Sequence, residues 1–240
     1  MSTIKSSAEN LTLNADGANN DIKFQSNGSE VASIDQAGLL TATSFAGNAD
    51  DLHIKSPTGE NMIKCVKDAQ VNLYYNNAAK LSTSSTGVTV TGGVAIGGTG
   101  AANTLDDYEE GSFTPVLYGT TTDGTPSYTY QIGRYTKVGN IVHCTIRMTT
   151  SALGGIDGQM RIGGLPFTSL NVSDLFSPAS CGYGAGLTVT AGNYVTGWIP
   201  VNLTYIRLTK WNSTVGTNYL GDADWSDTGS IMINCTYHVN

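Results

Sequence analysis

The chain has 240 residues, of which only 13% are charged, and its formal net charge is −7. Gly accounts for 29 of the 240 residues, or about 12%, against an average near 7%, and this enrichment fits β-structure with many turns. The acidic balance excludes the clustered Lys and Arg of a nucleic-acid-binding surface, and the absence of any apolar run near ~20 residues argues against membrane insertion.

Residues 1–20 precede the first strand-like pattern. They lack the apolar core of 7–15 residues that a secretory signal needs. We therefore expect the protein to be synthesised, and to assemble, in a cytoplasm.

An internal repeat occupies much of the first half, since residues 22–42 and 71–91 align at an offset of 49 residues. In each copy a short strand reaches a tight turn, at Asn27 and at Asn76, and two further strands follow. Asn suits the positive φ angles of such turns. Two copies are too few to bury their apolar side chains by stacking. We therefore expect an intertwined, repeat-built shaft in which identical chains wrap around one another, with a homotrimer as the favoured assembly.

Residues 92–104 are rich in Gly and Ala, which is typical of a neck or linker, and they end the expected shaft region at residues 21–104. A short acidic segment follows. Two opposed carboxylates are what glycoside hydrolysis requires, but adjacent carboxylates seldom face each other across a cleft. We interpret the segment as a solvated strap, either extended or one helical turn. Its carboxylates are Asp106, Asp107, Glu109 and Glu110.

Residues 105–240 alternate short strand-like runs with Gly- and Asn-containing turns, and no window has the 3.6-residue periodicity of a helix. This pattern predicts an all-β head, a β-sandwich of jelly-roll type. The apolar phase of residues 194–208 shifts near Ile206, which predicts one long strand with a bulge or bend. The expected strands lie at residues 113–118, 128–131, 134–137, 141–149, 160–167, 181–189, 194–208 and 231–239.

The cysteines do not have the spacing of a zinc or thioredoxin-type motif. Cys144 and Cys235 share the phase of the apolar residues around them, which predicts buried side chains with free thiols. The histidines are isolated in sequence, and His143 and His238 fall on the outward phase of their strands. A trimer axis would let one histidine from each chain meet in a metal site, and this alternative stays open.

Residues 211–227 are the best candidate for a binding surface. Flat aromatic rings contact the apolar face of a sugar, while carboxylates and amides bond its hydroxyl groups. Binding residues also tend to lie on loops held by a rigid scaffold. The competing interpretation is packing inside the head or at a subunit interface. The expected receptor- or glycan-contacting residues are Trp211, Asn218, Tyr219, Asp222, Asp224 and Trp225.

Other chemistry has weaker signals. Asp222, Asp224 and Asp227 offer oxygen ligands for Ca²⁺, but their segment lacks the Gly and the bidentate Glu of an EF-hand loop. No nucleophile-elbow, zinc-protease or P-loop motif occurs in the sequence. We therefore expect no catalytic residue, no cofactor and no metal.

Several strings resemble tail-fibre-like proteins of marine and freshwater bacteriophages, over most of residues 10–170. They are NNDIKFQSNGSEVASIDQAGLLTATSFAG, LDDYEEGSFTPVLYG, GRYTKVGNIVHCTIRM and RIGGLPF. The resemblance implies a homotrimeric virion appendage whose distal domain contacts a host-surface glycan or outer-membrane protein. It makes residues 1–20 a candidate segment for attachment to other virion proteins.

The main hypothesis is a tail fibre that mediates host-surface recognition and adsorption. The chain is short for a large fibre, so a capsid fibre or decoration protein is an alternative. A polysaccharide depolymerase is a second alternative, but it needs a long groove with opposed carboxylates, and a non-enzymatic role is expected. A secreted adhesin would need an export signal that residues 1–20 lack. The expected location is the virion, after synthesis in the host cytoplasm.

Overall fold

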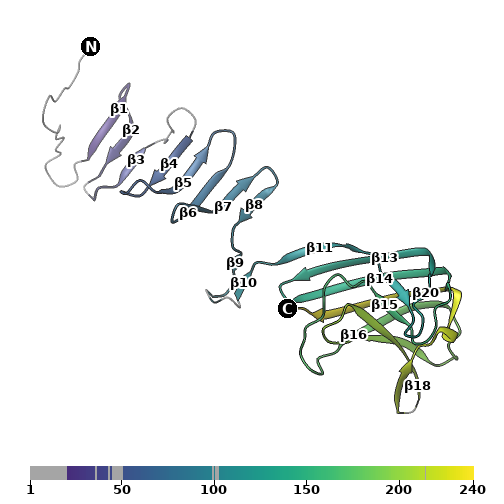
Figure 1. Cartoon of the computed structure of the whole chain (residues 1–240). Helices are drawn as coiled ribbons and strands as arrows, with labels where there is room; N and C mark the ends of the chain where they lie inside the picture. The colour runs from purple at the N-terminus through teal and green to yellow at the C-terminus, as the bar shows by residue number, and fades with distance from the viewer. Residues whose placement is uncertain are drawn as a thin grey trace. The chain divides into compact units, whose positions relative to one another are not determined.

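The computed structural model describes residues 21–240, apart from residues 36, 43, 45–50, 99, 101, 102 and 214. The candidate attachment segment, residues 1–20, lies outside the described residues. The chain divides into two compact units, Met1–Thr91 and Gly92–Asn240 (Figure 1). The regular structure of the described residues is strand, apart from single-turn 3-10 segments, so the all-β prediction is confirmed. Among these residues, no helix has the length and hydropathy to cross a membrane.

The described part of the first unit consists of two antiparallel sheets in which each strand pairs with the next along the chain. The three-stranded sheet contains β1 (Ile22–Ser26), β2 (Ser29–Ile34) and β3 (Leu40–Ala42). The five-stranded sheet contains β4 (Asp51–Lys55), β5 (Asn61–Val66), β6 (Val71–Tyr75), β7 (Ala78–Ser84) and β8 (Gly87–Val90).

The two copies of the sequence repeat form matching hairpins, β1–β2 and β6–β7. Phe24 and Leu73 occupy equivalent positions, and in both hairpins the register shifts directly after them. The turns also agree, because Asn27 has φ 52° and Asn76 has φ 50°. The next connections differ, since residues 35–39 link β2 to β3 whereas only two residues link β7 to β8. The repeat therefore encodes a bulged hairpin with an Asn turn.

One face of the five-stranded sheet is apolar across all its strands. Side chains alternate between the two faces of a strand, so direct cross-strand partners share a face. The opposite face carries the ion pair between Lys64 and Asp51, at 2.8 Å. No described hydrophobic side chain of residues 21–91 is buried, and Leu73 remains 41% exposed. The central row of the apolar face comprises Ile54, Ile63, Leu73, Leu81 and Val90.

The second unit contains a two-stranded ladder and a ten-stranded antiparallel sheet. The ladder joins β9 (Val94–Ala95) to β10 (Thr104–Leu105). The hydrogen-bonded order of the large sheet is β11-β13-β14-β20-β16-β17-β18-β15-β12, with β19 added on β18. Its strands are β11 (Tyr108–Phe113), β12 (Val116–Tyr118), β13 (Ser127–Val138), β14 (Ile141–Ala152), β15 (Arg161–Gly163), β16 (Ser177–Leu187), β17 (Tyr194–Ile199), β18 (Tyr205–Ser213), β19 (Gly216–Tyr219) and β20 (Trp225–His238).

The large sheet curls on itself. β11 and β12 lie at opposite ends of the strand order, although only Thr114 and Pro115 separate them in the chain. Two side chains of β13 hold the ends together. The Tyr128 hydroxyl accepts the Leu117 N–H at 2.8 Å, and Gln131 Nε2 donates to the Pro115 carbonyl at 3.0 Å. The curled sheet therefore encloses a core of its own, while the jelly-roll topology stays a prediction.

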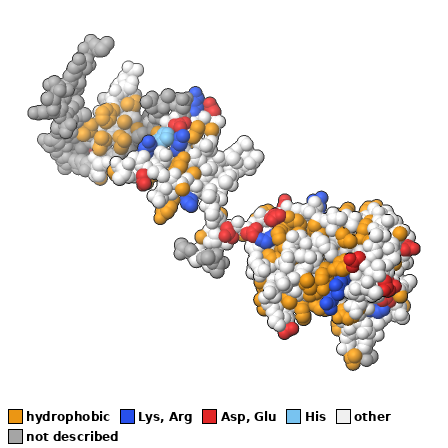
Figure 2. Space-filling view, in the orientation of Figure 1, with side chains coloured by type: hydrophobic (Ala, Val, Ile, Leu, Met, Phe, Trp, Pro, Cys, Tyr) orange, Lys and Arg blue, Asp and Glu red, His pale blue; other side chains and the backbone are white. Residues whose placement is uncertain are grey.

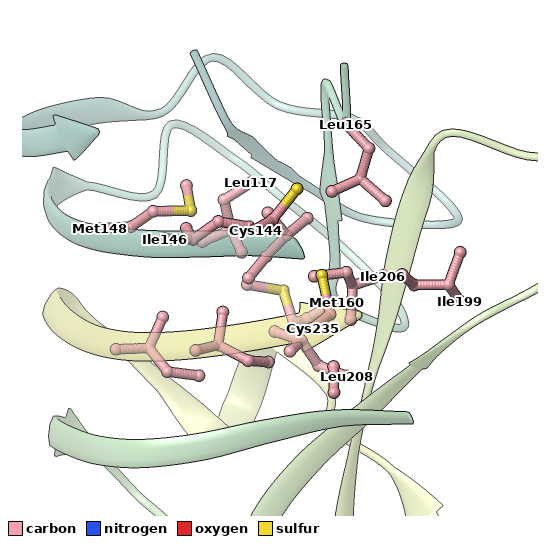
Figure 3. Packing of buried hydrophobic residues seen from close by; sticks show 14 of the residues in the cluster. Leu117, Cys144, Ile146, Met148, Met160, Leu165, Ile199, Ile206, Leu208 and Cys235 are labelled. Atoms are coloured by element: carbon pink, nitrogen blue, oxygen red, sulfur yellow. The ribbon is translucent and has the colours of Figure 1, made fainter. Parts of the chain in front are cut away.

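The core fills the inside of the curl, where side chains of β14 and β20 meet those of β18 (Figure 3). Cys144 and Cys235 are cross-strand partners, both are buried, and both thiols are free, as the sequence predicts. His143 and His238 are exposed on the outward phase. The inward residues of β14 expose no surface at all, and they are Val142, Cys144, Ile146 and Met148.

Five predicted strands of the second half need correction. Residues 194–208 are not one bent strand but the hairpin of β17 and β18. Pro200 lacks a backbone N–H and Asn202 has φ 56°, so the chain turns between Ile199 and Tyr205, just before the apolar phase shifts near Ile206. The strand predicted over 113–118 is interrupted between β11 and β12, and only β15 forms within 160–167. Conversely, residues 128–137 belong to the single strand β13.

The acidic segment is extended rather than helical, since it leads into the edge strand β11. Lys137 of β13, only 7% exposed, forms an ion pair with Asp107. The Tyr135 hydroxyl donates to the Glu109 carboxylate in the same pair of strands. These carboxylates thus tie the strand edge to β13, and they do not face one another across a cleft.

Candidate functional site

Residues 211–227 do not form one loop. They comprise the end of β18, β19, the 3-10 turn η2 (Asp222–Asp224) and the start of β20. Because these elements have different surroundings, the six candidate residues fall into different environments.

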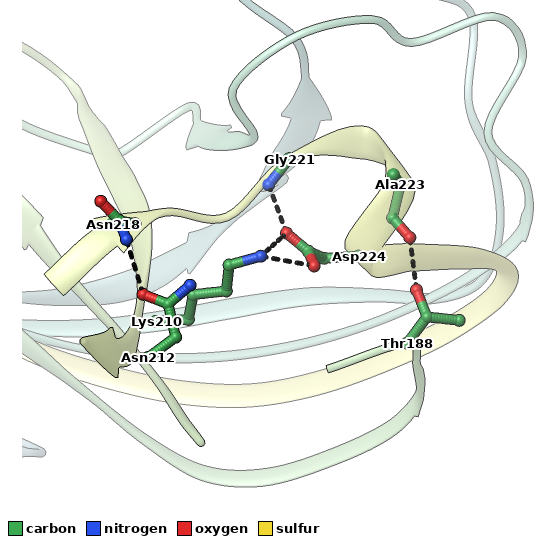
Figure 4. A network of polar contacts seen from close by, with 7 residues as sticks. All are labelled: Thr188, Lys210, Asn212, Asn218, Gly221, Ala223 and Asp224. Atoms are coloured by element: carbon green, nitrogen blue, oxygen red, sulfur yellow. Dashed lines mark hydrogen bonds and ion pairs between the residues drawn. The ribbon is translucent and has the colours of Figure 1, made fainter. Parts of the chain in front are cut away.

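Asp224 is held inside a polar network (Figure 4). Lys210 Nζ lies 2.6 Å and 2.5 Å from the two oxygens of its carboxylate, and the Gly221 N–H donates to it at 2.8 Å. The side chains of Lys210 and Asp224 are only 18% and 16% exposed. The carboxylate of Asp224 is paired and largely buried, so its bonds to Lys210 and to the Gly221 N–H hold η2 against β18.

Trp225 belongs to the core. It is 3% exposed, and its indole Nε1 donates to Thr150 Oγ1 at 3.0 Å. The ring lies so close to Gly229 that a Cβ there would come within 2.1 Å of Nε1. Its ring therefore packs under the sheet and does not line a surface.

The aspartates around η2 are bonded to three different groups. Asp222 Oδ1 accepts the Gly158 N–H at 3.3 Å, and Asp227 Oδ1 accepts the Leu153 N–H at 2.9 Å. Asp224 pairs with Lys210. Within the described part of the chain, no three His, Cys, Asp or Glu side chains are grouped to hold a metal ion. The carboxylates thus do not converge as the Ca²⁺ alternative requires.

Trp211 and Tyr219 remain on the surface, 53% and 42% exposed. Trp211 lies directly opposite Tyr194 of β17, which is 73% exposed. Both rings border a hollow of about 500 Å³ lined by residues 192–194 and 211–213, which we call the Trp211 hollow. Asn218 Nδ2 donates to Asn212 Oδ1 at 2.8 Å beside it (Figure 4). The structure therefore adds Tyr194 to the candidate residues, although its sequence pattern predicts only a strand position.

A second hollow, of about 340 Å³, lies where β16 and β17 diverge. It is lined by residues 181–187, 189 and 193–195, so it shares Tyr194 with the Trp211 hollow. The Cys181 thiol donates to the Tyr183 carbonyl at 3.2 Å, and burial raises the pKa of this thiol. A thiol held in its protonated form is a poor nucleophile, so this hollow favours binding rather than covalent chemistry.

No known family model matches this sequence, and no curated protein matches it either. Part of the fold is similar to the crystal structure of the Dettilon tailspike protein, with a TM-score of 0.49 and 21% sequence identity. The match covers 55% of this chain and 24% of the tailspike chain. The chain thus spans about a quarter of the length of that tailspike.

Proposed function

We propose that this protein is a virion structural protein of a bacteriophage, a tail fibre that assembles from identical chains and contacts the host surface through residues 92–240. The observation that carries the proposal is the apolar face of the sheet β4–β8, where Leu73 and Ile54 are exposed and no described hydrophobic side chain is buried. A sheet with one apolar face needs a second layer to bury it, and identical chains supply surface of the same chemistry. The sequence resemblance to tail-fibre-like proteins favours the same assembly, a homotrimer.

The two units have different roles in this proposal. The first unit has no buried hydrophobic side chain among its described residues, so it depends on neighbouring chains for stability. The second unit encloses a core and supports exposed aromatic rings at the Trp211 hollow. Several weak contacts on one assembly act together, so a low affinity at each hollow becomes useful through avidity.

A binding role is proposed rather than catalysis. The carboxylates of the candidate segment are bonded to main-chain N–H groups or to Lys210, which leaves none of them paired across a groove. A depolymerase is the alternative, and a loss of viscosity in a host polysaccharide solution on adding the protein would favour it.

Antibody labelling of virions in the electron microscope separates a tail fibre from a capsid fibre or decoration protein.

Adsorption to host cells tests the proposed function directly. Host cells incubated with purified full-length protein are expected to adsorb fewer virions, because the protein occupies the receptors. Trp211→Ala should weaken this competition, since it removes the ring that borders the hollow. Unchanged virion adsorption at saturating wild-type protein would contradict the proposed function.

Replacing Leu73 by Asp is expected to disrupt the assembly. Wild-type protein should have a molar mass of three times 25.1 kDa by light scattering. A carboxylate in the centre of the apolar row would be buried without a partner between chains, so the mass should fall toward that of one chain. Thr89→Asp is the matched control, because Thr89 is exposed and pairs with Ser82 on the other face. A wild-type monomer would remove the basis of the proposed shaft.

A further inference from the structure

Two arginines face each other on the outer surface of the curled sheet. Arg161 of β15 and Arg207 of β18 are direct cross-strand partners. Their neighbours Ile162 and Ile206 expose no surface and point into the core, so the arginines lie on the opposite face. Figure 2 shows Lys or Arg side chains beside hydrophobic ones on the second unit, with Asp or Glu side chains near them.

Aromatic side chains surround both guanidinium groups. Tyr118 of β12 is the cross-strand partner of Arg161, and Trp198 of β17 is that of Arg207. Arg161 lies 4.6 Å from the Tyr205 ring centroid, and Arg207 lies 5.0 Å from that of Trp198. We call this set the arginine–aromatic row, and its residues are Tyr118, Arg161, Trp198, Tyr205, Arg207 and Tyr219.

The positive charges of the row have no anionic partner among the described residues. None of the ion pairs found there includes an arginine. The Nε atoms of Arg161 and Arg207 are buried and lack an acceptor. A buried donor without an acceptor destabilises the folded chain, and like charges directly opposite each other destabilise a sheet further. The two adjacent arginines therefore destabilise the folded chain, and fold stability does not explain their presence.

Part of each arginine of the row is accessible to a ligand. Arg207 Nη1 donates to the Tyr219 hydroxyl at 3.1 Å. Arg161 and Arg207 are both half-buried, so part of each side chain reaches solvent. Burial acts to lower the pKa of Arg207, but the Tyr205 and Tyr219 hydroxyls outweigh it and the pKa is raised. The guanidinium group thus stays charged at any working pH.

We propose that the arginine–aromatic row binds an acidic saccharide, a sugar that bears a carboxylate or phosphate group. Guanidinium groups bind planar carboxylates and phosphates with paired hydrogen bonds, and the anion would neutralise two adjacent cations. Aromatic rings beside the charges contact the apolar face of the sugar ring. Because the chain itself has a net charge of −7, a local pair of cations selects for anionic groups that the remaining surface repels. This assignment rests on the proposed host-surface function and names the chemistry of its receptor.

Calorimetric titration of the full-length protein tests the row. The probes are tetragalacturonate for the carboxylate, glucose 6-phosphate for the phosphate and maltotetraose as the neutral sugar. We expect saturable binding of at least one acidic probe, weakened by added salt, and none of the neutral probe. Arg161→Met and Arg207→Met should each reduce the affinity by at least about tenfold. Arg207→Lys should also lose affinity, since an ammonium group lacks the paired donor geometry.

Arg147→Met is the matched control. Arg147 is exposed on β14 and also stacks on a ring, 4.5 Å from the centroid of Tyr130, so this variant removes the same charge outside the row. It should bind the acidic probe like the wild type. Equal affinity of all variants, or equal binding of maltotetraose, would overturn the assignment. A lower molar mass of Arg207→Met would instead identify the row as a subunit contact.

The proposed function and this assignment fail in different ways. If Arg207→Met loses the acidic sugar and no longer competes with virion adsorption, both are supported. If it competes as well as the wild type, the row is not the receptor site, although the proposed function survives. Failure of the wild-type protein to compete would contradict the proposed function, whatever the calorimetry gives.

Discussion

Trp225→Ala should lower the free energy of unfolding of the second unit by about 3–5 kcal/mol. The ring is 3% exposed, and its removal leaves a cavity beside Thr150 and Gly229, where neither residue has bulk to fill the space. Thr150 Oγ1 also loses the indole N–H that donates to it. Since both remaining tryptophans lie in the second unit, their fluorescence in a urea titration measures this change.

Trp211→Ala is the matched control for this measurement. Trp211 comes from the same predicted segment but is 53% exposed, so its loss should change stability by less than about 1 kcal/mol. At equal concentrations of folded protein, Trp211→Ala should weaken the competition with virion adsorption more than Trp225→Ala does. A small stability loss for Trp225→Ala would contradict the core assignment and return this ring to the candidate surface.

The alternation of apolar residues in the sequence indicates that Trp225 is buried, although the predicted strand at 231–239 does not include it. The apolar phase of Ile231, Ile233 and Cys235 extends backward by twos to residue 225. Asp227 and Gly229 interrupt the apolar pattern between Trp225 and Ile231, so the pattern predicts a strand only from residue 231. In the structure β20 runs through them, with Asp227 bonded to the Leu153 N–H. Alternation thus predicts the inward face well, but it fails where a polar residue has a main-chain partner.

The arginine–aromatic row was not predictable from local patterns. Its side chains come together only because four strands pair as neighbours, namely β12, β15, β17 and β18. These strands carry Tyr118, Arg161, Trp198 and Arg207, respectively. That pairing follows from the curl of the whole sheet, which brings β12 beside β15 although about forty residues separate them in the sequence. The hairpin repeat of the first unit, by contrast, depends on local turns at Asn27 and Asn76, and it was found from the sequence alone.

Lys210→Met should destabilise the second unit by about 3 kcal/mol, because it leaves the Asp224 carboxylate largely buried without its cation. The double variant Lys210→Met with Asp224→Asn should recover much of this loss. The amide is neutral, and its oxygen can still accept the Gly221 N–H that Asp224 now accepts at 2.8 Å. Urea unfolding of the wild type, both single variants and the double variant gives the coupling between the two charges.

The order of the variants decides what Asp224 does. If its charge is a structural partner of Lys210, Lys210→Met must be less stable than the double variant, since an unpaired buried charge costs more than a neutral pair. Asp222→Asn is the control, because Asp222 accepts one main-chain N–H at 3.3 Å and takes part in none of the ion pairs of the described residues. Equal stability of Lys210→Met and the double variant would mean that Asp224 remains well solvated without Lys210. Asp224 would then again be available to a receptor, as the sequence pattern of residues 211–227 predicts.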